Sequence, residues 1–80
     1  NLFCANLRGA DLNKAVLRNA NLSGADLTKT DFTLADMTSA RLWMRYFGKM
    51  PVAVLTGTNF QGAKMGNVDL SELDMSQAHR

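Results

Sequence analysis

The stretch ANLRGADLNKAVLRNANLSGADL, residues 5–27, repeats itself every five residues. An alanine opens each repeat and a leucine follows two places later, as in Ala5 and Leu7. A helix does not explain this spacing, because five residues turn a helix by about 500° and would wind the leucines around every side. An extended segment puts each alanine and its leucine on one face, but the odd period sends the next pair to the opposite face. The chain is therefore expected to turn once in every repeat, always in the same sense.

The two residues after each leucine are suited to that turn, since they are rich in Gly, Asn, Ser and Lys. A chain that turns regularly in one sense forms a coil, and stacked coils form a solenoid. We call the large residue of each repeat its centre and expect it to point inward. The centres are Leu2, Leu7, Leu12, Leu17, Leu22, Leu27, Phe32, Met37, Leu42, Leu55, Phe60, Met65, Leu70 and Met75.

The repeat register breaks after Leu42 and resumes at Ala53. Two of the residues between them, 43 and 44, take the usual place of the corner, which leaves eight inserted residues, 45–52. The stretches TDFTLADM (30–37) and TNFQGAKM (58–65) both pair a Thr with a Phe centre and then an Ala with a Met centre, and they lie 28 residues apart. Without the insertion this distance is 20 residues, or four repeats. One coil is therefore predicted to have four corners, so that Phe32 stacks on Phe60. In the last repeats Val68 and Leu73 replace the usual alanine, which predicts either a wider tube at this end or a cap.

The triplets ADL, ANL, ADM and TDF resemble the pentapeptide-repeat family over residues 1–44 and 53–77. The resemblance implies an all-β fold, a right-handed quadrilateral β-helix or solenoid with one inserted loop, 45–52. Fourteen centres at four per coil correspond to about three and a half coils. We expect a single repeat domain over residues 1–80. Because the chain starts in the middle of a repeat at Asn1, we interpret it as part of a longer protein.

The composition excludes several classes of protein. The net charge is only +2, far from the dense basic patch of a nucleic-acid-binding protein, so no nucleic acid is expected as a partner. No apolar run approaches the roughly 20 residues of a membrane span. The single cysteine, Cys4, rules out an internal disulfide.

Few residues in the sequence suggest catalysis. Asp11 and Asp31 should stack one coil apart, and paired carboxylates suit acid–base chemistry or a metal site. The alternative is that aspartate is simply common before a centre. His79 and Cys4 have no partner residue in the sequence, and a tube filled by its own side chains has no pocket. We predict no enzyme activity, no metal and no cofactor.

The interruption RLWMRYFGKMPVAV, residues 41–54, contains the only Trp, the only Tyr and the only Pro of the chain. Its cations Arg41, Arg45 and Lys49 recur every four residues, a spacing that favours a short helical turn ending at Gly48. Such a turn would gather the cations on one side of the loop.

Two interpretations of this loop remain open at the level of sequence. Aromatic residues near an arginine are typical of interface hot spots, which makes Trp43, Arg45, Tyr46 and Phe47 candidate partner-binding residues. Alternatively, Trp43 and Phe47 fold back and cover one side of the tube.

The sequence therefore predicts a non-catalytic protein–protein interaction or scaffold module. It would bind a protein partner through the inserted loop or through a flat outer face, and an end-to-end homodimer or a place in a larger complex is a further expectation. The family resemblance implies two alternatives: a DNA mimic that binds gyrase and confers quinolone resistance, or the repeat segment of a BTB-type adaptor. Seven acidic against nine basic residues argue against a DNA mimic, which needs a dominant acidic face.

Overall fold

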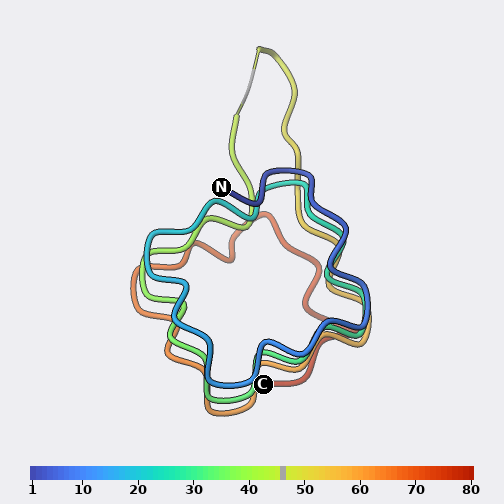
Figure 1. Ribbon diagram of the computed structural model, residues 1–80. Helices are drawn as coiled ribbons and strands as arrows, with labels where there is room; N and C mark the ends of the chain where they lie inside the picture. Colours follow the sequence, from blue (N-terminus) through green and yellow to red (C-terminus); the bar gives the residue numbers. More distant parts are fainter. Residues whose placement is uncertain (46) are drawn as a thin grey trace.

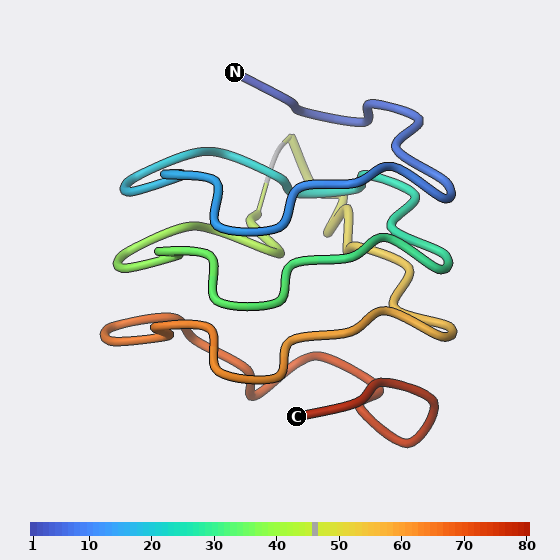
Figure 2. The ribbon, with the colours of Figure 1, turned by 60° about the horizontal axis from the view of Figure 1, so that its bottom comes forward.

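The computed structural model describes residues 1–45 and 47–80. Figure 1 shows the chain winding in stacked coils of square outline, and Figure 2 shows the coils one above another. The described residues form no helix and no continuous strand, because each side of the square contributes only an isolated bridge. The all-β prediction is thus met by single bridges between coils and not by extended strands.

Each corner of the square is a tight turn after a centre. The backbone N–H of Ala5 donates to the Leu2 carbonyl at 3.0 Å, and that of Ala35 donates to the Phe32 carbonyl at 2.9 Å. In most corners the second residue has a positive φ, as type II turns require at that place, and Gly24 at 71° adopts it without strain. Leu34 also has a positive φ, of 60°, although this backbone conformation is unfavourable for a bulky side chain. The predicted corners after each leucine are confirmed.

Parallel pairing of successive coils holds the stack together. Asp26 is bracketed by the coil above, because its N–H donates to the Ala5 carbonyl and its carbonyl accepts from the Leu7 N–H, both at 2.9 Å. After the insertion the same pairing joins residues 28 apart, as in Asp31 and Asn59. Four corners per coil and an insertion of eight residues are therefore both confirmed.

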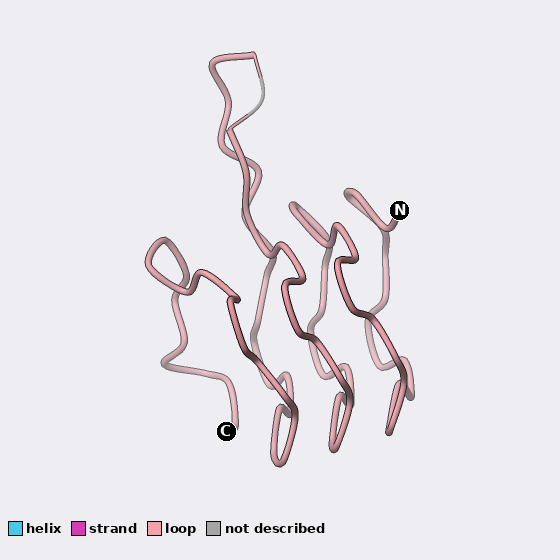
Figure 3. Cartoon of the chain, turned by 90° about the vertical axis from the view of Figure 1, so that its left-hand side faces the viewer, coloured by secondary structure: helices cyan, strands magenta, loops and turns pink. Residues whose placement is uncertain are grey.

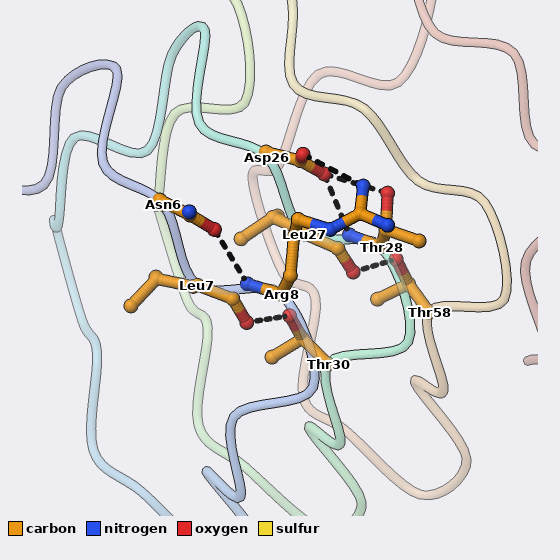
Figure 4. Close-up of polar contacts among 8 residues, drawn as sticks. All are labelled: Asn6, Leu7, Arg8, Asp26, Leu27, Thr28, Thr30 and Thr58. Carbon is orange, nitrogen blue, oxygen red and sulfur yellow. Dashed lines mark hydrogen bonds and ion pairs between the residues drawn. The ribbon is translucent and has the colours of Figure 1, made fainter.

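The core lies on the axis of the tube. Phe32 is fully buried, and its ring stacks on that of Phe60 with centroids 5.4 Å apart and planes 4° from parallel. Thr30 and Thr58 stand where most repeats have alanine. Each donates its hydroxyl at 2.6 Å to the carbonyl of a centre one coil earlier, Leu7 and Leu27 respectively (Figure 4). A buried hydroxyl is thus satisfied within the tight corner space.

The C-terminal end differs from the rest. In Figure 1 most of the segment after Gly66, drawn in orange to red, runs inside the outline of the other coils, and only the last residues return to it. Val68 and Leu73 are half-buried there and pack against the core. The expectation of a wider tube is wrong, because the backbone that carries these two residues runs inside the outline of the other coils and their side chains pack against the core. Bridging to the coil above resumes only at His79, opposite Asn59.

Candidate functional site

The inserted loop is a hairpin that projects from one corner of the tube (Figure 3). An antiparallel bridge joins Trp43 to Val52, and the Met44 N–H donates to the Pro51 carbonyl at 3.3 Å. Phe47 and Gly48 have φ values of 46° and 75° and form a turn. The helical turn expected from the spacing of the cations is wrong, because the chain reverses at these residues and returns antiparallel to itself.

The hairpin leaves and rejoins the tube without breaking the corner. The Ala53 N–H donates to the Leu42 carbonyl at 2.8 Å. This is the hydrogen bond that closes the other corners, such as Ala5 to Leu2 at 3.0 Å, but here it spans the whole insertion. The loop is therefore an addition to a corner that is already closed.

The base of the hairpin packs on the same corner of the coil above. A Cβ atom at Gly24 would lie 2.9 Å from the Cys4 Sγ and 3.0 Å from the Pro51 Cβ, so only glycine fits between the tube and the loop. On the other arm, the Asn21 side-chain amide donates to the Met44 sulfur at 3.6 Å. These contacts fix both arms where they leave the tube.

The candidate residues of the loop are separated along the hairpin. Trp43 is half-buried at the base, and its buried indole N–H forms no hydrogen bond of normal geometry with any residue that the structure describes. Phe47 is 89% exposed at the tip, and Arg45 is exposed as well. Tyr46 lies outside the described residues. The interpretation that the aromatics cover the tube thus fits Trp43 and is wrong for Phe47.

Trp43 is close to a carboxylate on the next coil. The pKa of Asp69 is lowered by the hydroxyl and backbone N–H of Ser71, and to a smaller extent by the indole of Trp43. The two residues also line one small cleft beside Leu42. Trp43 therefore packs at the base of the loop against the next coil.

An apolar hollow lies between the hairpin and the same corner of the first coil. It has a volume of about 440 Å³ and is lined by Phe3, Cys4, Lys49, Met50 and Pro51. Met50 is 39% exposed on the rim, and the Cys4 thiol is free and exposed. Apolar surface thus extends from the hairpin onto the tube.

The aspartates of the flat sides serve the corners. Asp26, Asp31 and Asp36 each accept hydrogen bonds from the backbone N–H and the hydroxyl of the threonine two residues later. These bonds, the hydroxyl first, lower the pKa of all three carboxyls, that of Asp36 to about 2. Asx turns of this kind explain the Asp or Asn of the repeat.

This role was not predicted from the sequence, although the spacing Asp-x-Thr occurs there three times, at Asp26, Asp31 and Asp36. Asp11 and Asp31 do stack one coil apart, as predicted. Asp11 accepts the Asn13 N–H at 3.0 Å, so both carboxylates are held by their own turns. Arg8 adds an ion pair with Asp26 at 3.0 Å across one side (Figure 4), and an exposed pair of this kind contributes little to stability.

These turns predict an acid-labile fold. A carboxyl whose pKa is lowered on folding stabilises the folded state above its ordinary pKa of 3.8, and the stabilisation is lost as the pH falls toward the folded value. We expect the urea midpoint, followed by circular dichroism, to be constant down to about pH 5 and to fall between about pH 4 and 2. In the matched variant Asp36→Asn the amide oxygen still accepts both bonds but does not titrate, so the fall should be smaller. Equal midpoints at both ends of this range would contradict the prediction.

Other kinds of site have little support in the part of the chain that the structure describes. No three His, Cys, Asp or Glu residues gather there in a way that could hold a metal ion. No helix among residues 1–45 and 47–80 is long and apolar enough to cross a membrane.

The family of the repeats follows from comparison with known proteins. No curated protein matches this chain. A family model described as pentapeptide repeats matches residues 1–43 and 53–79 in 8 copies, leaving out the hairpin. The match covers most of the chain and every coil described above, so this protein belongs to the pentapeptide-repeat family.

Proposed function

We propose that this chain is a non-catalytic protein-interaction module whose hairpin presents its contact residues to a protein partner. The coils would form the right-handed quadrilateral β-helix implied by the family, which serves as a rigid support. The observation that carries the proposal is the position of Phe47, 89% exposed at the tip of a hairpin whose base is fixed.

The arrangement favours binding for a physical reason. An exposed aromatic side chain gains most when a partner buries it, and aromatic and arginine residues dominate binding hot spots. Because both arms of the hairpin are already fixed, binding would cost less conformational entropy than binding by a flexible loop. Phe47 and Arg45 are the proposed contact residues, Trp43 holds the base, and Tyr46 stays a predicted contact.

The other functions have weaker support. Enzyme activity is not proposed, because the stacked carboxylates of Asp11 and Asp31 accept hydrogen bonds from the backbone N–H groups of their own turns. DNA mimicry needs a continuous acidic side, whereas Arg8 and Arg18 pair with Asp26 and Asp36 across the coils. No observation favours a BTB-type adaptor over other contexts for the repeat.

Photo-crosslinking tests the proposal. Replacing Phe47 with a benzophenone analogue of phenylalanine should yield a discrete adduct in lysate of the source cells. Val16, 74% exposed on a flat side, carries the same group in the matched control. Excess unmodified chain should compete for the adduct, and a Phe47→Ala chain should compete about 30-fold less well, as expected for a hot spot of about 2 kcal/mol. Equal adducts from both positions, or equal competition by the alanine variant, would refute the proposal.

A further inference from the structure

One edge of the third coil has lost its hydrogen-bonding partner. Val54 is paired with the coil above, since its N–H donates to the Ala25 carbonyl and its carbonyl accepts from the Leu27 N–H, both at 2.9 Å. On the opposite edge the equivalent groups are the Ala53 carbonyl and the Leu55 N–H. Neither forms a backbone hydrogen bond with any described residue.

The next side of the same coil shows what is missing. There His79 is bracketed in the usual way, because its N–H donates to the Thr58 carbonyl at 2.8 Å and its carbonyl accepts from the Phe60 N–H at 2.6 Å. By the repeat register, Asp74 should bracket in the same manner below Val54. It does not, because the chain after Gly66 has moved inside the outline of the coils (Figure 1).

The displacement opens a groove along this edge. The groove has a volume of about 410 Å³ and is lined by residues 52–56 on one wall and by Glu72, Asp74 and Gln77 on the other. Two of these described lining residues are carboxylates and none is a cation. The pKa of Asp74 is lowered by the Ser76 hydroxyl and backbone N–H, so its carboxylate is charged at neutral pH.

We propose that this groove binds an extended basic peptide segment, which adds to the open edge parallel to the coils. One peptide residue would take the place that Asp74 has left: its N–H would donate to the Ala53 carbonyl, and its carbonyl would accept from the Leu55 N–H. Unpaired strand edges bind peptides in this way, with backbone bonds for affinity and side chains for specificity. Lysines beside that residue would pair with Glu72 and Asp74, and its own apolar side chain would stack on Val54, which is 47% exposed. This surface adjoins the base of the hairpin at Val52 but includes neither Arg45 nor Phe47, and the proposal does not depend on the function proposed for the hairpin.

Nuclear magnetic resonance of the complete ¹⁵N-labelled chain tests the edge in two steps. In the free protein the Leu55 amide should exchange with solvent at least about tenfold faster than the Leu27 amide, its bonded counterpart one coil above. The probe is then acetyl-Ala-Lys-Val-Lys-Ala-amide, which should cause saturable shifts at residues 53–56 and slow the exchange of Leu55.

Three matched controls separate the contributions. N-methylation of the probe's valine removes the donor to Ala53 and should abolish binding. A probe with glutamates in place of the lysines, and the chain variant Glu72→Gln with Asp74→Asn, should each weaken binding about tenfold or more. Exchange at Leu55 as slow as at Leu27 would overturn the proposal. Binding that survives N-methylation would overturn it too, because the peptide would then be held by charge alone.

Discussion

Replacing Phe32 with alanine is expected to lower the free energy of unfolding by about 3–5 kcal/mol. The side chain is fully buried, and its ring stacks on Phe60 at the centre of the tube. Truncation removes apolar burial and leaves a cavity that the coils cannot close, because the coil of Phe32 is fixed by ladder bonds to the coil above and to the coil below. A small domain has a total stability of roughly 5–15 kcal/mol, so the loss is a large fraction of it.

Urea denaturation followed by circular dichroism measures this loss. Val16→Ala is the matched control, since Val16 is 74% exposed and its truncation should change stability by less than about 0.5 kcal/mol. Leu12 belongs to the same stack as Phe32 but is only half-buried, so Leu12→Ala should have an intermediate effect. A loss below about 1 kcal/mol for Phe32→Ala would contradict a core packed around this ring.

The square coil could be predicted because a repeated sequence gives the same local signal many times. One Ala-Asp-Leu triplet decides nothing, but a period of five held over residues 5–27 excludes a helix. The number of corners came from a single irregularity, the Phe centres at Phe32 and Phe60, which must stack if one coil is four repeats.

The displaced C-terminal segment could not be predicted in the same way. Two tendencies compete there: the ladder places Asp69 and Asp74 below the preceding coil, and larger residues at Val68 and Leu73 favour covering the end of the core. The sequence shows that alanine is missing from both positions, but not which tendency prevails. The outcome depends on packing between residues far apart in the chain.

The shape of the loop could not be predicted from local sequence patterns either. Arg41, Arg45 and Lys49 have helical spacing, but the hydrogen bond from Ala53 to Leu42 holds both ends of the insertion at one corner. A segment of this length with its ends together reverses direction more readily as a hairpin than as a helix. Its composition did identify the segment as the place to search for a binding surface, and Phe47 is exposed there.

Deleting residues 45–52 is expected to separate folding from binding. The Leu42 carbonyl and the Ala53 N–H are already joined at 2.8 Å, so Trp43 and Met44 would become an ordinary two-residue corner. The entropic cost of closing a loop depends only weakly on its length, so the free energy of unfolding should change by about 1 kcal/mol or less. Because the second corner residue has a positive φ in most of the other repeats, the deletion should be made in parallel with Met44→Gly, which removes any strain at that place.

Binding should respond very differently to the same deletion. As a competitor in the crosslinking assay at position 47, the deletion variant should be weaker than the unmodified chain by about 30-fold or more, since it lacks both Phe47 and Arg45. Denaturation curves of both deletion variants provide the folding control. If the variants unfold at much lower urea while the folded Phe47→Ala chain competes as well as the unmodified one, the hairpin is a structural flap. The interaction surface would then have to lie on the flat sides of the tube, where the threonines and aspartates of the corners are displayed.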